Sequence, residues 1–279
     1  MNLFKNRKVG FIGTGNMGQA MIKALVDSKT VSPSQIYVSN RSGGKLKKVE
    51  ELYGVRPVRT NEELVDECDV VVLAVKPQDL TQVLEPIASS FHSGHLVISV
   101  AAGFTLKSLK KLIPNAGAIV RAMPNTAAVI QKAVVGYCMA EGAEAYEETV
   151  KEFLSPLGLV VHAEEENGCF EALTVSCASG TGFVLELMQY WQEWIEEHGF
   201  DPQTARKMVV QTFLGAAEMA EKSDTTSISE LQDKVVSKKG VTFSGLQSMR
   251  ELEIERALRY SFEKAALRDQ ELSQGTAKQ

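Results

Sequence analysis

The stretch that decides the fold lies near the N-terminus, where Lys8-Val9-Gly10-Phe11-Ile12 leads directly into Gly13-Thr14-Gly15-Asn16-Met17-Gly18. The short apolar run predicts a buried strand, and the G-x-G-x-x-G pattern predicts a tight turn into a helix. In this pattern Gly13 allows the turn, Gly15 lets the backbone approach a pyrophosphate, and Gly18 lets the helix pack close to the strand. The stretch therefore predicts a dinucleotide at the start of the first helix.

The residues that follow strengthen this prediction, since a glycine pattern alone also occurs in ordinary turns. Ala20-Met21-Ile22 and Ala24-Leu25-Val26 continue as an apolar helix face, and Gln35-Ile36-Tyr37-Val38-Ser39 predicts a second strand. Together these segments form a βαβ unit of about 30 residues, the size expected for a dinucleotide-binding motif.

The residues after the second strand, Asn40-Arg41-Ser42, indicate which dinucleotide binds. A site for NAD usually has Asp or Glu here to accept hydrogen bonds from the ribose 2′-OH, and that carboxylate is missing. Arg41 can instead form a fork onto a 2′-phosphate, with Asn40 and Ser42 as further donors. The pattern predicts NADP, with NADPH preferred and NADH still possible. The alternative is that Arg41 is an ordinary loop arginine.

The composition limits the class of protein. The chain has 279 residues, of which 44% are hydrophobic and 23% charged, so it is long enough for one large globular domain or two moderate ones. The net charge of −5 argues against a nucleic-acid surface. The longest apolar stretches, at 70–75 and 96–102, have the length of strands, and the N-terminus lacks a signal-peptide apolar region. We therefore expect a cytoplasmic protein without a membrane span.

The four cysteines show neither pairing nor the spacing of metal ligands. This usage predicts reduced thiols and no metal site.

Short β-branched runs alternate with helical segments up to about residue 162. Beyond the first two strands, the sequence predicts strands at 70–75, 96–100, 118–123, 133–138 and 159–162, which suggests roughly eight strands in all. The alternation predicts an α/β fold whose N-terminal part is a Rossmann-type doubly wound parallel sheet.

After residue 163 the apolar residues recur at helical spacing. We expect helices over 202–222 and 227–236, and a long final helix that ends near Leu272. The chain is therefore divided into a dinucleotide-binding domain (1–163) and an all-α dimerisation and substrate domain (164–279). So many apolar helix positions predict a homodimer, and assembly of dimers into a larger oligomer stays open.

Small or polar residues follow three of the predicted strands, at the place where ligands lie in an open α/β sheet. These segments are Ala74–Gln78, Ser99–Gly103 and Arg121–Thr126. Pro77 and Pro124 would be costly inside a strand, so each marks the exit of the chain from the sheet. Any one segment could be an ordinary loop, but three at corresponding places favour a binding edge.

These residues resemble the pyrroline-5-carboxylate reductase family over essentially the whole length of the chain. The resemblance lies in the segments Phe11–Met17, Asn40–Ser42, Asn61, Ala74–Gln78, Met123–Thr126 and Ser237–Leu246. In that family a Rossmann domain donates hydride from a nicotinamide to the C=N carbon of a cyclic imine, and a helical domain dimerises to complete the site. The resemblance implies NADPH-dependent reduction of 1-pyrroline-5-carboxylate to L-proline, the last step of proline biosynthesis.

The resemblance and the glycine pattern together imply a set of cofactor-binding residues. They are Gly13, Thr14, Gly15, Asn16, Met17, Asn40, Arg41, Ser42, Asn61, Ala74, Val75, Lys76, Pro77 and Asn125.

In the family a Ser-x-x-Gly-x-Thr segment binds the substrate, and this chain keeps Ser237, Gly240 and Thr242 at that spacing. The resemblance implies that Ser237 and the backbone N–H groups of Gly240 and Val241 grip the substrate carboxylate. Thr242 would hydrogen-bond the ring nitrogen, so Thr242 and Ser237 are the catalytic candidates. Hydride addition to a protonated imine needs positioning and a carboxylate clamp, not a strong general acid. The alternative is that Ser237 or Thr242 only caps the last helix.

The substrate segment departs from the family pattern, which usually has Ser-Pro-Gly-Gly where this chain has Ser237-Lys238-Lys239-Gly240. If the first of those glycines needs a positive φ, Lys239 is strained there. The family's Ser-Gly-Ser-Gly-Pro-Ala-Tyr appears as Cys177–Phe183, and Ala127 stands where the family usually has Pro. These changes indicate a divergent paralogue.

Two alternative functions remain. The first is another NADP-dependent imine or oxo-acid reductase on the same plan. β-Hydroxyacid dehydrogenases place a catalytic lysine on the first long helix of the second domain, but this chain has no lysine between Glu171 and Glu197. The second is a dinucleotide-binding regulator without turnover, which would keep the cofactor residues and lose the substrate segment.

Overall fold

The structure is a computed structural model that describes residues 3–277, with side chains described through residue 273. Residues 1–2 and 278–279, the outer ends of the two predicted domains, lie outside the described part. The chain divides into two compact units. One holds the residues up to Thr181 and those from Ala265 onward, and the other holds Gly182–Lys264. The predicted domain boundary after residue 163 stays a prediction.

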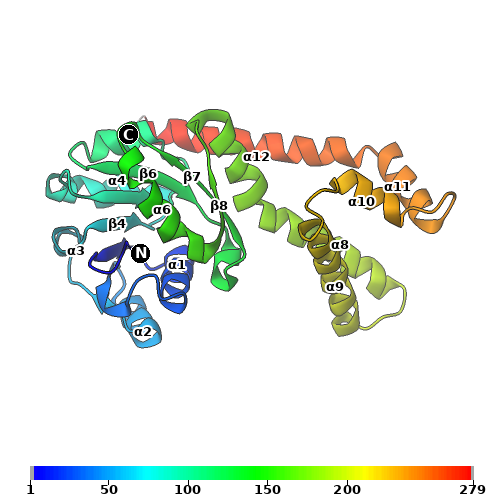
Figure 1. Cartoon of the computed structure of the whole chain (residues 1–279), viewed down its shortest axis with the longest axis horizontal. Helices are drawn as coiled ribbons and strands as arrows, with labels where there is room; N and C mark the ends of the chain where they lie inside the picture. Colours follow the sequence, from blue (N-terminus) through cyan, green and yellow to red (C-terminus); the bar gives the residue numbers. More distant parts are fainter. Residues whose placement is uncertain (1–2, 278–279) are drawn as a thin grey trace. The chain divides into compact units, whose positions relative to one another are not determined.

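Eight strands within the described residues form a single sheet, coloured blue to green in Figure 1. They are β1 Val9–Ile12, β2 Ile36–Ser39, β3 Arg56–Pro57, β4 Val70–Leu73, β5 Leu96–Ser99, β6 Ala118–Met123, β7 Ala133–Met139 and β8 Gly158–His162. The strand order is β3-β2-β1-β4-β5-β6-β7-β8. Its first six strands have the order of the doubly wound dinucleotide-binding fold, which confirms the predicted fold class.

The sheet departs from the predicted parallel arrangement at one pair. β6 and β7 are antiparallel, whereas the other neighbouring pairs of the described sheet are parallel. A parallel connection needs a crossover of a dozen or more residues, and the connecting segment 124–132 is too short for one.

Helices cover both faces of the sheet. Apart from the helical residues from Ala265 onward, the helices of this unit are α1 Asn16–Asp27, α2 Gly43–Tyr53, α3 Asn61–Glu67, α4 Pro77–Leu84, α5 Leu106–Leu112, α6 Glu147–Leu154 and α7 Glu171–Leu173. Short single turns precede or follow several of them. A turn of the wider π type follows α7 at Thr174–Ala178, and the segment Glu166–Phe170 before α7 is kinked at Asn167 and Gly168, where the backbone is not helical.

The core of the sheet unit consists of two apolar layers, because alternate residues of each buried strand point to opposite faces. Phe11 on β1 packs in one layer with Met21 of α1 and Phe153 of α6. The next residue, Ile12, packs in the other layer with Leu64 of α3 and Leu80 of α4. β1 is packed on both faces, so the loop that follows it starts from a rigid strand.

The second unit is helical. Its elements are most of α8 Gly180–Glu197, then α9 Pro202–Glu221, α10 Ile228–Val235, α11 Val241–Glu251 and the first part of α12 Ile254–Ala277. The predicted starts are confirmed: the Asp201 side chain accepts hydrogen bonds from the N–H groups of Gln203 and Thr204 at α9, and Ser227 forms a capping box with Glu230 at α10.

The expectation of one long final helix was wrong. The chain breaks it between α11 and α12, where Glu253 has a φ of 51°. This left-handed backbone ends α11 and redirects the chain.

Taken alone, the helical unit buries little apolar surface. Its core cluster contains Ile195, Ala205 and Val209, whereas Trp191 and Trp194 are 50% and 59% exposed. Exposed apolar side chains in such numbers are typical of a surface that binds another protein chain.

One helical run of the described residues, Glu166–Glu197, is long and apolar enough to cross a membrane by length and composition. It corrects the expectation that the longest apolar stretches have only strand length. A single such run is weak evidence for a membrane span, since helices of other proteins pass the same test.

Candidate functional site

The glycine loop between β1 and α1 has the geometry that a dinucleotide needs. Gly13 has a φ of 102°, which side-chain-bearing residues rarely adopt. A Cβ on Gly18 would lie 2.5 Å from the carbonyl oxygen of Gly13, so the close packing of α1 requires a glycine there. No atom lies within 4 Å of the position a Cβ of Gly15 would take, which leaves the backbone open to a ligand. Gly13 and Gly18 thus have the structural roles predicted for them, and the open backbone at Gly15 fits its predicted contact with a pyrophosphate, which stays a prediction.

The start of α1 is suited to an anion. Gly15 is its N-cap and offers no capping side chain, and its first turn contains no acidic residue. The N–H groups of that turn have no partner inside the helix, and the helix dipole adds partial positive charge.

A cavity of about 940 Å³ opens at the carboxyl ends of β1, β2 and β4, beside this loop. It has a size typical of ligand sites, and it lies where the strand order reverses. Eight of the predicted cofactor residues line it: Gly13, Gly15, Asn40, Arg41, Asn61, Ala74, Val75 and Lys76. Asn61 begins α3, and its side-chain oxygen accepts a hydrogen bond of 2.6 Å from the hydroxyl of Ser39.

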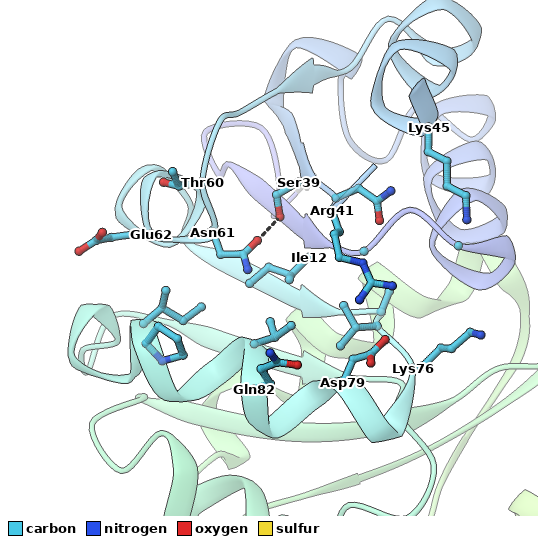
Figure 2. A pocket seen from close by; sticks show the side chains of 18 of the residues that line it. Ile12, Ser39, Arg41, Lys45, Thr60, Asn61, Glu62, Lys76, Asp79 and Gln82 are labelled. Atoms are coloured by element: carbon cyan, nitrogen blue, oxygen red, sulfur yellow. Dashed lines mark hydrogen bonds between the residues drawn. The ribbon is translucent and has the colours of Figure 1, made fainter. Parts of the chain in front are cut away.

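Cationic side chains dominate the walls of this cavity. Arg41, Lys45, Arg59 and Lys76 line it, against the carboxylates of Glu62 and Asp79. Figure 2 shows Arg41, Lys45 and Lys76 at the same end of the cavity, together with Asp79, while Glu62 lies at the other end. In a chain of net charge −5, this local excess of positive charge favours a polyanionic ligand.

Sequence reasoning missed Lys45 and Arg59. Neither residue is among the predicted cofactor residues, and no motif includes either of them. Their positions, in the first turn of α2 and just before α3, are the available signal: both elements begin at the carboxyl edge of the sheet.

Six predicted cofactor residues do not line the cavity. They are Thr14, Asn16, Met17, Ser42, Pro77 and Asn125. Asn16 and Met17 begin α1, Ser42 is the N-cap of α2, and Pro77 begins α4.

Thr14 and Asn125 are buried side chains. The hydroxyl of Thr14 has no hydrogen-bond partner among the described residues. The Asn125 side chain accepts a hydrogen bond of 3.0 Å from the Ala127 N–H and donates one of 3.0 Å to the Cys177 carbonyl. These bonds give Asn125 a structural task, and its contact with a cofactor stays a prediction.

The substrate segment Ser237–Thr242 forms a tight turn that leads into α11. The N–H of Gly240 donates a hydrogen bond of 3.0 Å to the carbonyl of Ser237, so Lys238 and Lys239 are the two central residues of the turn. A Cβ on Gly240 would lie 2.1 Å from the hydroxyl oxygen of Ser237. The predicted Ser and Gly are therefore packed directly against each other.

Two expectations about this segment change. Gly240 is the N-cap of α11 and the helix has no side-chain cap, so neither Ser237 nor Thr242 serves as the predicted capping residue. The Gly240 N–H closes the turn, which makes it a poor candidate for gripping a carboxylate. The N–H groups of Val241 and Thr242 begin the helix and lack partners inside it, so they are better donors for an anion.

Comparison with known proteins relates the residues of the cavity and those of the turn Ser237–Thr242 to one protein family. A family model described as NADP oxidoreductase coenzyme F420-dependent matches residues 8–103, and one described as pyrroline-5-carboxylate reductase dimerisation matches residues 167–272. Pyrroline-5-carboxylate reductase of Methanosarcina acetivorans is 34% identical over 271 residues, which cover 96% of this chain and 98% of the relative. The chain belongs to the pyrroline-5-carboxylate reductase family.

Other members agree with this assignment. Pyrroline-5-carboxylate reductase 2 of Bacillus subtilis is 30% identical over 270 residues, 96% of each chain. The solved structure of a pyrroline-5-carboxylate reductase from Coxiella burnetii matches with a TM-score of 0.88 at 30% identity, over 96% of this chain and 99% of that one. Pyrroline carboxylate reductase of Plasmodium falciparum, solved with NADP bound, has a TM-score of 0.86. At 23% identity, that likeness shows the shared fold alone.

The turn of this pyrroline-5-carboxylate reductase family member has two lysines at its centre. Lys239 has a φ of 58°, and Lys238 does not have a positive φ. A positive φ at the third residue is what a type II turn requires, and Pro followed by Gly is its preferred sequence. The Ser-Pro-Gly-Gly pattern of the family fits the same turn. Lys239 therefore occupies the strained position that the sequence predicts, at a cost of roughly 1 kcal/mol.

Proposed function

We propose that this protein reduces the C=N bond of 1-pyrroline-5-carboxylate to form L-proline, with NADPH as the hydride donor. The observation that carries the proposal is the turn Ser237–Gly240 followed by the open N-terminus of α11, in a chain that also has a cationic dinucleotide cavity. The names of its relatives at 30–34% identity support the reaction.

The cavity residues fit NADPH. The start of α1 and the open backbone at Gly15 suit the pyrophosphate, because both offer N–H groups without an intervening side chain. Arg41 and Lys45 suit the 2′-phosphate, since a guanidinium fork and an ammonium group can bind the same dianion. We assign Lys76, Asn61 and the backbone of Ala74 and Val75 to the remaining contacts, as predicted.

When bound, the nicotinamide supplies a hydride to the imine carbon. The protein's own residues hold the substrate: Ser237 and the N–H groups of Val241 and Thr242 receive its carboxylate at the positive end of α11. The Thr242 hydroxyl donates a hydrogen bond to the ring nitrogen when the imine is neutral. It accepts a hydrogen bond from the N–H of the ring when the imine is protonated. Because the imine is readily protonated, positioning and the charge of the clamp provide most of the catalysis.

We also propose a homodimer formed through the helical unit. The match of the dimerisation model to residues 167–272 supports it, as do the half-exposed Trp191 and Trp194. Light scattering should give twice the chain mass, or a multiple of two chains if dimers assemble further.

The experiment that tests the proposed reaction follows NADPH oxidation at 340 nm on addition of pyrroline-5-carboxylate, with proline identified as product. Turnover that depends on both compounds is expected. NADPH binding without turnover at saturating substrate would reject the reaction and leave the regulator, the alternative that the Lys238-Lys239 substitution keeps open.

A further inference from the structure

A buried arginine connects the sheet to the end of the last helix. Arg121 lies on β6 and is 4% exposed, and its guanidinium sits 4.5 Å from the centre of the Phe170 ring. One terminal nitrogen donates to the carboxylate of Glu166 at 2.6 Å. Its other two nitrogens have no hydrogen-bond partner among the described residues. A buried guanidinium with a single bonded partner is costly, so the carboxylates around it matter.

Asp269 on α12 interacts electrostatically with this arginine, with Glu166 and with Glu171 of α7. Asp269 is half-buried, and it belongs to the compact unit that contains the sheet. The neighbouring Gln270 donates a hydrogen bond of 2.8 Å to Glu171. The end of α12, red in Figure 1, is thus tied to the sheet unit by polar side chains.

The same end of α12 rests on the loop that follows β5. Gly103 has a φ of 75°, and a Cβ there would lie 2.8 Å from the Cβ of Leu272. The backbone of Gly103 also forms a hydrogen bond with the Asp269 carboxylate. Three residues further on, the N–H of Leu106 donates to Glu166 at 2.7 Å, through the oxygen that binds Arg121. One charged cluster therefore holds both sides of the loop.

This loop lies at the functional edge of the sheet. β5 pairs with β4, and the N–H of Val100 donates to the carbonyl of Leu73 just before the cavity-lining residues Ala74–Lys76. In the proposed cofactor site, Arg41 on the β2 side receives the 2′-phosphate, and the backbone at Gly15, after β1, receives the pyrophosphate. An extended dinucleotide bound in this way would direct its nicotinamide end toward β4 and β5. The loop Ala101–Gly103 follows β5 at that edge, although its residues do not line the cavity.

We propose that Asp269 is a positioning residue: with Leu272 it fixes the loop Ala101–Gly103 against which the nicotinamide end of the cofactor is placed. This inference rests on the proposed cofactor site. The end of α12 would then help to align the hydride donor, while the first part of the same helix belongs to the helical unit.

Two opposing effects act on the pKa of Asp269. Burial raises it above the ordinary value of 3.8, although Arg121 and the Gly103 hydrogen bond oppose that shift and Glu171 and Glu166 add to it. Because the folded state binds this proton more tightly than the unfolded state, the protonated form contributes stability below pH 3.8, and this contribution is lost as the pH rises through the raised pKa. The hydrogen bond to Gly103 favours the carboxylate instead, so protonation weakens the contact with the loop even though it favours burial of the side chain.

The test compares Asp269→Ala, which removes the acceptor, with Asp269→Asn, which keeps an acceptor oxygen without the charge. Glu271→Gln is the control, since Glu271 is exposed on the same helix and pairs with Arg268 at 2.8 Å. Amide hydrogen exchange of residues 100–106 should be about tenfold faster in Asp269→Ala, as expected for a lost charged hydrogen bond, and intermediate in Asp269→Asn. The control should match the wild type.

Two further readouts separate positioning from general loosening. The kcat of Asp269→Ala should fall about tenfold while the dissociation constant of NADPH changes less than about twofold. After correction for intrinsic chemistry, loop exchange in the wild type should rise as acidic pH protonates Asp269, and this rise should be absent in Asp269→Asn.

Loop exchange equal to that of the wild type in Asp269→Ala would overturn the inference, as would faster exchange spread evenly over the sheet unit. Exchange is measured without substrate, so it decides the role of Asp269 even if the proposed reaction fails.

Discussion

Two regions differ in how strongly packing determines their shape: the edge of the sheet at the glycine loop Gly13–Gly18 (the cofactor edge) and the turn Ser237–Gly240 (the substrate turn). The glycine loop follows a strand that is buried on both faces, and Gly13 and Gly18 fit against backbone atoms of the same unit. The turn at Ser237 is exposed, and Val241 is 93% exposed. One hydrogen bond and one close contact define its shape. Packing within one chain thus determines the shape of the proposed cofactor site, while the residues proposed to bind the substrate lie where packing constrains the sequence least.

The largest effect is expected from a substitution that disturbs only the substrate turn. In Gly240→Ala the new Cβ would lie 2.1 Å from the Ser237 hydroxyl oxygen, so that hydroxyl has to rotate away from its position. We expect kcat to fall about a hundredfold, because a displaced binding group of this kind can cost that much. Steady-state kinetics with pyrroline-5-carboxylate measure the loss.

Gly245→Ala is the matched control, since it lies on the same helix and no atom lies within 4 Å of the new Cβ. It should keep the wild-type kcat, and NADPH binding should be unchanged in both variants. A Gly240→Ala enzyme with wild-type turnover would show that the turn does not position the substrate.

The second effect lies at the cofactor edge. Arg41→Ala should raise the Michaelis constant for NADPH about tenfold, through loss of a charged hydrogen-bonding partner. Lys45→Ala should raise it less, because an ammonium group provides a point charge and no fork. The Michaelis constants for NADH should scarcely change in either variant. Equal effects on the two cofactors would reject the 2′-phosphate role of these residues.

The sequence predicted the cofactor edge better than the substrate turn, for a physical reason. At Gly13, Gly15 and Gly18 the local backbone needs a residue without a side chain, so the pattern could be interpreted residue by residue. Lys45 and Arg59 were missed because a lysine or arginine on a surface helix or loop has no local signature. Only the fold brings them to the cavity.

Other differences also arise from tertiary structure. No glycine or proline stands at the helix break around Glu253, so the sequence gives no local signal for it. The φ of 51° there depends on the surrounding tertiary structure. The antiparallel pairing of β7 follows from the length of one connection. The commitment of the Gly240 N–H to its own turn could not be predicted from the spacing of Ser237, Gly240 and Thr242.

A smaller effect tests the strain in the substrate turn. Lys239→Gly removes a side chain from a position with φ of 58°, and relief of the left-handed strain outweighs the added entropy of the unfolded chain. We expect the variant to be more stable by about 0.5 kcal/mol. Lys238→Gly is the control, because Lys238 does not have a positive φ. It should be no more stable than the wild type in urea denaturation.

The smallest effect separates the two units by their response to acid. In the sheet unit, burial lowers the pKa of His95 below 6.5, and the nearby His92 adds to this shift. The neutral form is favoured in the folded state, so its contribution to stability is complete above pH 6.5 and is lost as the pH falls through the lowered pKa.

In the helical unit the pKa values of Asp201 and Glu230 are lowered by hydrogen bonds at helix starts. Their contributions are lost only as the pH falls below their ordinary values of 3.8 and 4.5. Hydrogen exchange near pH 5.5 should therefore show loosening around His95 before α9 and α10. The opposite order would contradict these assignments.

The most direct test of the central claim compares the wild type with Thr242→Ala in NADPH oxidation driven by pyrroline-5-carboxylate. The account predicts that the wild type forms proline, and that Thr242→Ala loses turnover while it binds NADPH and unfolds as the wild type does. A wild type that binds NADPH but forms no proline, or a Thr242→Ala variant with unchanged turnover, would contradict it.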